Sequence, residues 1–321
     1  MEDQNLTPEQ IQMIMQHYKL SEQEHNEILD TVKRITFMEA EPTDNPIAII
    51  IGGQAAAGKS SIISYSRKLF RDGNVAVINS DTIKGFYPNI EEVAHKHPTL
   101  FTKITDQESN TWTSDTFDTA IEGRYNLIFE GTMKNTRILS TIERLKEKGF
   151  TVIVRGMAVS KPQSLLSLHE RYKREIKYKG WGRLVEINHH NQTYEGMPKT
   201  MNQIEKSGLA DIIEIYERGL QDDFKPELIF AKHNRGLQNT EFIDLEYLSS
   251  PYFRNRSANA FQAINAGRRD EERRILPEIE SRLSSLLKTD GLQIWQTESE
   301  QSQLEKLQDE LDNFLSIGDR D

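Results

Sequence analysis

The chain has 321 residues, with 50 acidic and 40 basic side chains, a formal net charge of −10 and no cysteine. The lack of cysteine excludes disulfide scaffolds, zinc–thiolate sites, iron–sulfur clusters and cysteine nucleophiles. The acidic balance argues against a protein that coats nucleic acid or a membrane surface. The longest apolar run, Ile47–Ile51, is far shorter than the roughly 20 residues that span a bilayer. We therefore expect a cytoplasmic protein with no membrane or nucleic-acid partner.

Two helices are predicted before the first strand. Thr7–Gln10 and Ser21–Glu24 both have the pattern of a capping box, in which a hydroxyl residue precedes a helix and Glu or Gln follows three residues later. The two prolines in Glu41–Pro46 end this section because they cannot continue a helix. Residues 1–40 are thus predicted to be a helical extension. It could restrain the rest of the chain, or it could simply cover apolar surface.

Strand and helix signals alternate through the middle of the chain. Continuous β-branched runs separated by helices are typical of a parallel sheet that is covered on both faces. The sequence therefore predicts an α/β domain over residues 47–250 with a mostly parallel sheet. The predicted strands are Ile47–Ile51, Val75–Ile78, Asn126–Phe129, Thr151–Val159 and a short Leu228–Phe230. The predicted helices are Ser60–Phe70, Ile138–Lys148 and Pro162–Tyr178.

After about residue 255 the sequence becomes charged and helical. Helices are predicted at Asn255–Leu287 and Glu298–Leu315, and they form a C-terminal extension over residues 255–321. The second helix carries leucines at spacings of three and four, which places them on one face. This pattern favours a surface helix that packs on the main body, although a helix that binds a partner or a second copy has the same pattern. The leucines are Leu304, Leu307, Leu311 and Leu315.

A phosphate-binding loop, or Walker A motif, lies directly between the first predicted strand and the following helix. Gly53–Ser60 matches the pattern G-x-x-x-x-G-K-S, and its context is the one that the motif requires. Backbone amides of such a loop bind phosphate, while Lys59 bridges the β- and γ-phosphates and Ser60 offers its hydroxyl to Mg²⁺. The motif predicts a P-loop NTPase or kinase fold. The predicted nucleotide-binding residues are Gly53, Gln54, Ala55, Ala56, Ala57, Gly58, Lys59, Ser60 and Ser61.

Two carboxylates follow other strands of the predicted sheet. Asp81 comes shortly after Val75–Ile78, and Glu130 follows Asn126–Phe129. Ligands of open α/β sheets sit beyond the carboxyl ends of the strands, so both residues are expected at the site. Asp81 is a candidate general base or metal ligand. The alternative is that Asp81 is only the N-cap of a helix that starts at Thr82.

Two arginines and two histidines occur later in the chain. Arg171 and Arg183 suit a lid that clamps the transferred phosphoryl group. His189 and His190 lack a second histidine or carboxylate at metal-ligand spacing. We interpret the two histidines as part of a polar loop and not as a metal site.

Taken together, these features resemble the zeta toxin family over about residues 47–235. Zeta toxins are P-loop kinases of toxin–antitoxin systems, and known members use ATP and Mg²⁺ to phosphorylate the 3′-hydroxyl of the amino sugar in UDP-N-acetylglucosamine. The resemblance implies a bacterial growth-inhibiting toxin with a nucleotide-sugar substrate and an antitoxin partner. The matching segments are Gly52–Gln54, Val77–Thr82, Tyr87–Asn89, Tyr125–Thr132, Met157–Val159, Glu170–Tyr172, Arg183 and His190.

The resemblance also implies roles for individual residues. Asp81 matches the base that takes the proton from the sugar hydroxyl, and Arg171 and Arg183 match arginines on the ATP phosphates. Glu130 and Thr132 match substrate contacts. The remaining positions depart from the family pattern on the acceptor side: Ser114, with Asp115 beside it, replaces a substrate-binding glutamate, and Lys134 replaces an arginine.

These departures leave the phosphate acceptor open. The alternatives to a nucleotide sugar are another nucleotide, such as the adenosine ribose of NAD, or a nucleotide-dependent switch or assembly module without an acceptor.

Overall fold

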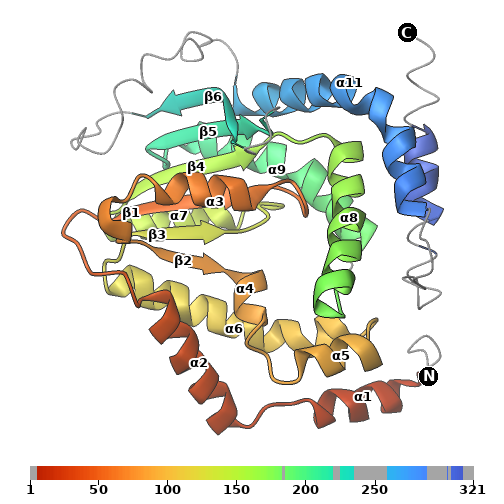
Figure 1. Cartoon of the computed structure of the whole chain (residues 1–321). Coiled ribbons are helices and arrows are strands. Elements are labelled where there is room, and N and C mark those ends of the chain that lie inside the picture. Colours follow the sequence, from red (N-terminus) through yellow and green to blue (C-terminus); the bar gives the residue numbers. More distant parts are fainter. Residues whose placement is uncertain are drawn as a thin grey trace.

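A six-stranded sheet with the order β2-β3-β1-β4-β5-β6 forms the centre of the protein (Figure 1). The computed structural model describes residues 6–182, 185–219, 225–234, 259–287, 302 and 305–313. The paired neighbours among β1 to β5 run parallel, and β6 runs antiparallel to β5 at one edge. The predicted, mostly parallel sheet is therefore confirmed. The strands are β1 (Ile47–Gly52), β2 (Ala76–Asn79), β3 (Leu127–Glu130), β4 (Thr151–Met157), β5 (Ile212–Glu217) and β6 (Glu227–His233).

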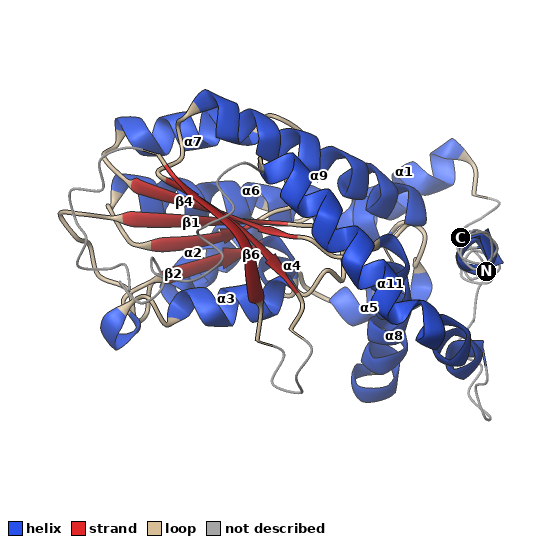
Figure 2. Cartoon of the chain, turned by 90° about the horizontal axis from the view of Figure 1, so that it is seen from above, coloured by secondary structure: helices blue, strands red, loops and turns tan. Residues whose placement is uncertain are grey.

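Helices cover both faces of the sheet, with α3 on one side and α7 on the other (Figure 2). Apolar side chains of α6, α7, α9 and α11 share one buried cluster with the sheet, whereas α3 contributes to a separate cluster. The helices are α1 (Pro8–His17), α2 (Glu22–Thr36), α3 (Lys59–Arg67), α4 (Ser80–Lys84), α5 (Ile90–Lys96), α6 (Phe101–Glu122), α7 (Ile138–Glu147), α8 (Lys161–Lys179), α9 (Ile187–Ser207) and α11 (Ala260–Leu287). No helix in these described ranges has both the length and the apolar content to cross a bilayer.

Strand β1 shows why the sheet needs both layers. Ile49 and Ile51 lie in the cluster with Ile62 of α3, while Ala48 and Ile50 lie in the opposite cluster with Trp112 of α6. All six side chains are fully buried. A strand that is covered on both faces has no polar side to alternate with, which explains the continuous apolar run in the sequence.

Three long elements escaped the sequence analysis: α6, α9 and β5. Helix α6 buries several threonines, whose hydroxyls donate to carbonyls one turn earlier, as Thr105 does to Phe101 O (2.8 Å) and Thr116 to Trp112 O (2.7 Å). Such bonds make a polar residue compatible with burial, so the buried face of α6 does not show an apolar pattern in the sequence. Pro198 lies inside α9, where a proline usually indicates a break in the helix, and the buried Glu214 interrupts the apolar pattern of β5. These two elements were missed for those reasons.

The N-terminal helices pack onto the main body. Both predicted capping boxes are present, at Thr7 and Ser21. Tyr18, Leu29 and Val32 are buried in the large cluster on the α6 side of the sheet. These contacts favour the packing alternative over a restraint. The boundary at residue 40 stays a prediction.

The C-terminal extension also packs onto the body. Ala260 and Ile264 of α11 lie in the main core, and Leu307 and Leu311 are buried in a cluster with leucines of α8 and α11. This agrees with the interpretation of the leucine stripe as a packing face. Leu304, Leu315 and the first residues of the predicted helix Asn255–Leu287 lie outside the described residues.

We expect Val32→Ala to lower the free energy of unfolding by about 1.5–3 kcal/mol, because the Val32 side chain is only 1% exposed. Thermal and denaturant unfolding measure this loss. Arg34→Ala is the control, since Arg34 is exposed on the same helix. Equal stability of the two variants would mean that α2 does not contribute to the core.

Candidate functional site

The loop Gly53–Ser60 connects the carboxyl end of β1 with the N-terminus of α3. Gly58 is the N-cap residue of α3 and has a φ of 91°, a conformation that L side chains rarely adopt. It makes no side-chain cap, so the first amides of α3 remain without a capping side chain. Amides at a helix N-terminus attract anions. The geometry is thus that of a phosphate-binding loop.

Lys59 lies back over this loop. Its Nζ donates to the carbonyl oxygens of Gly53 (3.1 Å) and Gln54 (3.0 Å) and lies 3.4 Å from Oε1 of Glu130. The side chain is therefore held over the loop from which it comes and next to the carboxylate that ends β3.

A buried amide ties the loop to the rest of the fold. The Gln54 side chain is fully buried, and its Nε2 donates to Val159 O (2.9 Å) and Ser164 Oγ (3.2 Å). It thus anchors the loop to the connection between β4 and α8. Ala55, by contrast, lines the cavity described below.

Asn79 organises the carboxylates beside the loop. It ends β2 directly opposite Glu130 of β3, and its amide nitrogen donates to the Glu130 carboxylate. Its Oδ1 accepts from the backbone amides of Asp81 (2.8 Å) and Thr82 (3.1 Å), so Asn79 is the N-cap of α4. The alternative interpretation of Asp81 as the N-cap is therefore wrong. Asp81 lies in the first turn of α4 and lines the cavity.

Burial raises the pKa of Glu130, and the nearby negative charge of Asp81 adds to this rise. The positive charges of Lys59 and Arg171 oppose it. The net direction is upward, because burial penalises the charged carboxylate more than the cations compensate.

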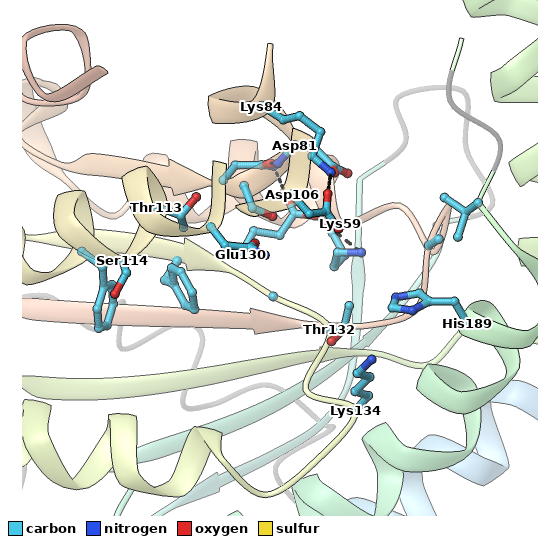
Figure 3. Close-up of a pocket in the computed structure, with 18 of the residues that line it drawn as sticks. Lys59, Asp81, Lys84, Asp106, Thr113, Ser114, Glu130, Thr132, Lys134 and His189 are labelled. Carbon is cyan, nitrogen blue, oxygen red and sulfur yellow. Dashed lines mark hydrogen bonds and ion pairs between the residues drawn. The ribbon is translucent and has the colours of Figure 1, made fainter. Parts of the chain in front are cut away.

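A cavity of about 610 Å³ lies at the carboxyl ends of the strands and collects eight of the seventeen predicted site residues (Figure 3). In the view of Figure 3, Thr113 and Ser114 lie to one side of the cluster, and Lys134 and His189 to the other. The predicted residues that line the cavity are Ala55, Lys59, Asp81, Ser114, Glu130, Thr132, Lys134 and Arg171. Asp115 and the other predicted loop residues are not among the lining residues: these are Gly53, Gln54, Ala56, Ala57, Gly58, Ser60 and Ser61. Arg183 lies outside the described part of the chain.

Helix α6 forms a wall of the cavity that the sequence analysis missed, apart from Ser114. Its lining residues fall at helical spacing on one face: Asp106, Asn110, Thr113, Ser114 and Phe117. Lys84 of α4, whose side chain is buried, forms an ion pair with the half-buried Asp106 of this wall. The spacing would have revealed the wall if the helix itself had been recognised.

Helix α8 stands across the carboxyl end of the sheet, toward which the arrows of the parallel strands point (Figure 1). It carries Arg171 into the lining of the cavity. The Nε of Arg171 is buried and makes no hydrogen bond to the described residues. A buried guanidinium nitrogen without a partner is costly, so this atom suits an anionic ligand.

Arg218, directly after β5, is a second cation at the loop and was not predicted. Its Nη2 donates to Ala56 O and its Nε to Ala57 O (3.3 Å), while Nη1 donates to Ser167 Oγ of α8 (3.0 Å). Burial lowers the pKa of Arg218. The position after a strand end was the available signal, but β5 itself had not been predicted.

The interpretation of His189 and His190 as a loop is wrong, because both lie in the first turn of α9. His189 lines the cavity. His190 is buried, and its Nε2 lies 2.9 Å from Ser164 Oγ. Burial lowers the pKa of His190 to about 4. A neutral His190 therefore supports the packing of α9 on α8 at neutral pH.

We expect Glu130→Gln to raise the melting temperature of the ligand-free protein at pH 7. The raised pKa means that the ionised carboxylate destabilises the folded state above the ordinary glutamate value of 4.5. The gain should shrink as the pH falls below that value, where Glu130 is protonated in both states. Thermal unfolding from pH 4 to 8 measures it, with exposed Glu147→Gln as the control. A lower melting temperature for Glu130→Gln at pH 7 would contradict the expected penalty.

The sequence matches known toxins over its central part. A family model described as Zeta toxin matches residues 30–226. Toxin zeta of Enterococcus hirae is 31% identical over 181 residues, which cover 54% of this chain and 62% of that protein. Toxin PezT of Streptococcus pneumoniae serotype 4 is 27% identical over 175 residues, which cover 54% of this chain and 69% of that protein. The chain thus spans about three fifths of the length of the first relative.

Solved structures share the fold. A structure from the characterisation of the PezAT chromosomal toxin–antitoxin system of Streptococcus pneumoniae has a TM-score of 0.64 at 21% identity, covering 85% of this chain and 100% of that chain. A complex of AvrRxo1-ORF1 with AvrRxo1-ORF2 and sulphate ions has a TM-score of 0.52 at 12% identity, covering 94% and 95%. At these identities the likeness concerns the fold alone. The family model covers more than half of the chain, and the chain therefore belongs to the zeta toxin family of P-loop, kinase-like toxins.

Proposed function

We propose that the chain is an ATP-dependent kinase that transfers the γ-phosphate to a sugar hydroxyl of a nucleotide sugar such as UDP-N-acetylglucosamine. The observation that carries the proposal is one cavity lined by Lys59 of the phosphate loop, Asp81 and Arg171. These three side chains come from different elements and have the charges that phosphoryl transfer needs.

The phosphate side of the cavity is built from fixed cations and amides. Lys59 exchanges its contacts with the loop carbonyls and Glu130 for the β- and γ-phosphate oxygens. Arg171 donates its Nε, which has no hydrogen-bond partner among the described residues, to the transferred group and so stabilises charge that grows in the transition state. Arg183 is proposed as a second arginine in this role, on the resemblance alone.

Magnesium fits the donors around the loop. Ser60 is exposed in the first turn of α3 and offers a hydroxyl oxygen, and Asp81 lines the cavity with carboxylate oxygens. Hard oxygen ligands of this kind are the ones that Mg²⁺ prefers. We propose that Ser60 holds the ion, which when bound neutralises charge on the β- and γ-phosphates.

Asp81 is proposed as the general base. Its backbone amide is held by Asn79 Oδ1 (2.8 Å), which fixes the start of α4 at the rim of the cavity. The acceptor oxygen gives its proton to the Asp81 carboxylate and forms a bond to the γ-phosphorus, while the bond from that phosphorus to the β–γ bridging oxygen breaks and ADP leaves.

The wall opposite the loop has the chemistry of a sugar-binding surface. Asn110, Thr113 and Ser114 present amide and hydroxyl groups, and the rings of Phe117 and Phe129 lie 4.7 Å apart beside them. Polar hydrogen-bonding groups next to aromatic rings suit a sugar that carries a base or an acyl group. Thr132 and Lys134 follow Glu130 into the same cavity and are proposed as further substrate contacts.

An antitoxin is the proposed protein partner. The proposal rests on membership of the family and on the PezAT toxin–antitoxin system among the similar structures.

We expect the purified protein to transfer phosphate from ATP to one member of a panel of UDP-sugars and dinucleotides. Mass spectrometry should find a product one phosphate heavier than its substrate, and a UDP-sugar should react best. A phosphorylated NAD would instead support the alternative acceptor. If the protein hydrolyses ATP but phosphorylates neither a panel member nor any compound in a metabolite extract, the kinase proposal fails. That result would support a nucleotide-dependent switch.

We expect Lys59→Ala and Asp81→Asn to fail in different ways. Lys59→Ala should lose about 10²–10³ in rate, because it removes the charge on the phosphates. Asp81→Asn should lose about 10²–10⁴ in transfer but keep its affinity for ATP, since asparagine cannot take the proton. Steady-state kinetics and ATP titration separate the two. A parallel loss of ATP affinity in Asp81→Asn would make Asp81 a metal ligand instead.

A further inference from the structure

Helix α11 reaches the back of the phosphate loop from outside the part of the chain that matches the family. The family match ends at residue 226, whereas α11 begins at Ala260. Even so, α11 buries two charged side chains, Arg268 and Glu271, each only 3% exposed. Burying charge is costly unless each group finds specific partners. The partners of these two residues therefore indicate what the helix does.

Arg268 contacts the loop and α9 together. Its Nη2 donates to Gln54 Oε1 (3.4 Å), and its Nη1 donates to Tyr194 O (2.9 Å). The guanidinium carbon also lies 3.8 Å from the centre of the Tyr194 ring. Burial lowers the pKa of Arg268 to about 10, so the side chain stays charged at neutral pH. A cation over an aromatic face and bound to oxygens recovers part of the cost of its burial. The Nε of Arg268 is buried and makes no hydrogen bond to the described residues.

Gln54 links Arg268 to Lys59 through its side chain and its backbone carbonyl. The amide nitrogen of Gln54 is already bound to Val159 O and Ser164 Oγ, and Arg268 binds the remaining oxygen of the same amide. The backbone carbonyl of Gln54 in turn accepts from Lys59 Nζ (3.0 Å). The side chain of Gln54 therefore fixes a carbonyl that orients Lys59.

Glu271 contacts the start of α8. Its carboxylate accepts from the backbone amide of Ser160, the N-cap residue of α8, whose own side chain makes no cap. The helices and strands pack closely here, since a Cβ added to Gly267 would lie 2.6 Å from Ile229 and 3.1 Å from Ala158. One turn of α11 thus contacts both the loop that carries Lys59 and the helix that carries Arg171.

We propose that α11 is an integral part of the nucleotide site and that Arg268 is a positioning residue, which acts through Gln54 to hold the phosphate loop in its nucleotide-binding conformation. This inference rests on the proposed function only in taking ATP as the ligand of the loop. A helix that merely covered apolar surface would place an aliphatic side chain at position 268.

The test compares ATP binding with stability in full-length variants. Arg268→Met keeps most of the side-chain volume but loses both hydrogen bonds. Ile264→Ala removes a fully buried apolar side chain one turn earlier on α11, which lies in the main core and makes no polar contact with the loop. We expect Arg268→Met to raise the Kd for ATP with MgCl₂ about 10–100-fold, the size of effect that misplaced groups produce. Ile264→Ala should lower the melting temperature but leave that Kd within about twofold of wild type. Arg269→Gln is the charge-matched control on the exposed face of α11.

The outcomes separate the two proposals. If wild type does not bind ATP, the proposed function fails; if wild type binds and Arg268→Met binds equally well, only the positioning role fails. Should Arg268→Met not fold, Arg268→Lys decides, because lysine keeps the charge near Tyr194 but cannot donate to Gln54 and Tyr194 O from a rigid fork. Unchanged affinity in a folded Arg268→Lys would then overturn the role. A double-mutant cycle with Gln54→Ala should also be non-additive in the Kd, and additive losses would show that Arg268 does not act through Gln54.

Discussion

Lys59 and Glu130 can meet across 3.4 Å because β1 and β3 run parallel and side by side. Parallel strands end at the same edge of a sheet, so the loop after β1, Asn79 at the end of β2 and Glu130 at the end of β3 are brought together by the sheet register alone. The cavity and its chemistry follow from this one pairing. A slip of β3 by one residue would turn Glu130 to the other face of the sheet and remove it from the loop.

The position of Glu130 beside Lys59 leaves the negative charge at the site only partly compensated. Glu130 is largely shielded from solvent, which raises its pKa. Asp81 adds negative charge, and Lys59 and Arg171 only partly offset it. A nucleotide that took Lys59 away from Glu130 would strengthen this imbalance, unless a cation or a protonated carboxyl accompanied it. The proposed Mg²⁺ would supply such charge, and the hydrogen bond from Asn79 keeps Glu130 in place during the exchange.

The sequence predicted those parts of the fold and site that depend on patterns of neighbouring residues. The apolar run of β1, the spacing from Gly53 to Lys59 and the capping boxes at Thr7 and Ser21 are all local, and the structure contains each of them. Helix α6 was missed because its buried face contains threonines, which look polar in the sequence. Their hydroxyls donate to carbonyl oxygens of the same helix, so the threonines can be buried. Apart from Ser114, the cavity wall from Asp106 to Phe117 was missed with it.

Other residues of the site could not be found from pattern at all. Asn79, Arg218 and Arg268 act through partners that lie far away in sequence, and no spacing rule connects them. The sequence around Asp81 suggested Asp81 as an alternative N-cap, whereas the N-cap of α4 is Asn79. Asn and Asp are both favoured at this position, so only the backbone geometry distinguishes them.

The phosphate loop shows why such distant partners are needed. A loop with glycine at both ends is free to adopt many conformations, and binding must overcome the entropy of fixing it. Here Arg218 holds the carbonyls of Ala56 and Ala57, and Arg268 holds the side chain of Gln54. A loop that is ordered before the nucleotide arrives loses less entropy on binding, and donors fixed in advance stabilise the transition state without reorganising. The two arginines come from beyond β5 and from α11, so the residues of the motif would supply the proposed phosphate contacts while distant parts of the chain hold the loop in place.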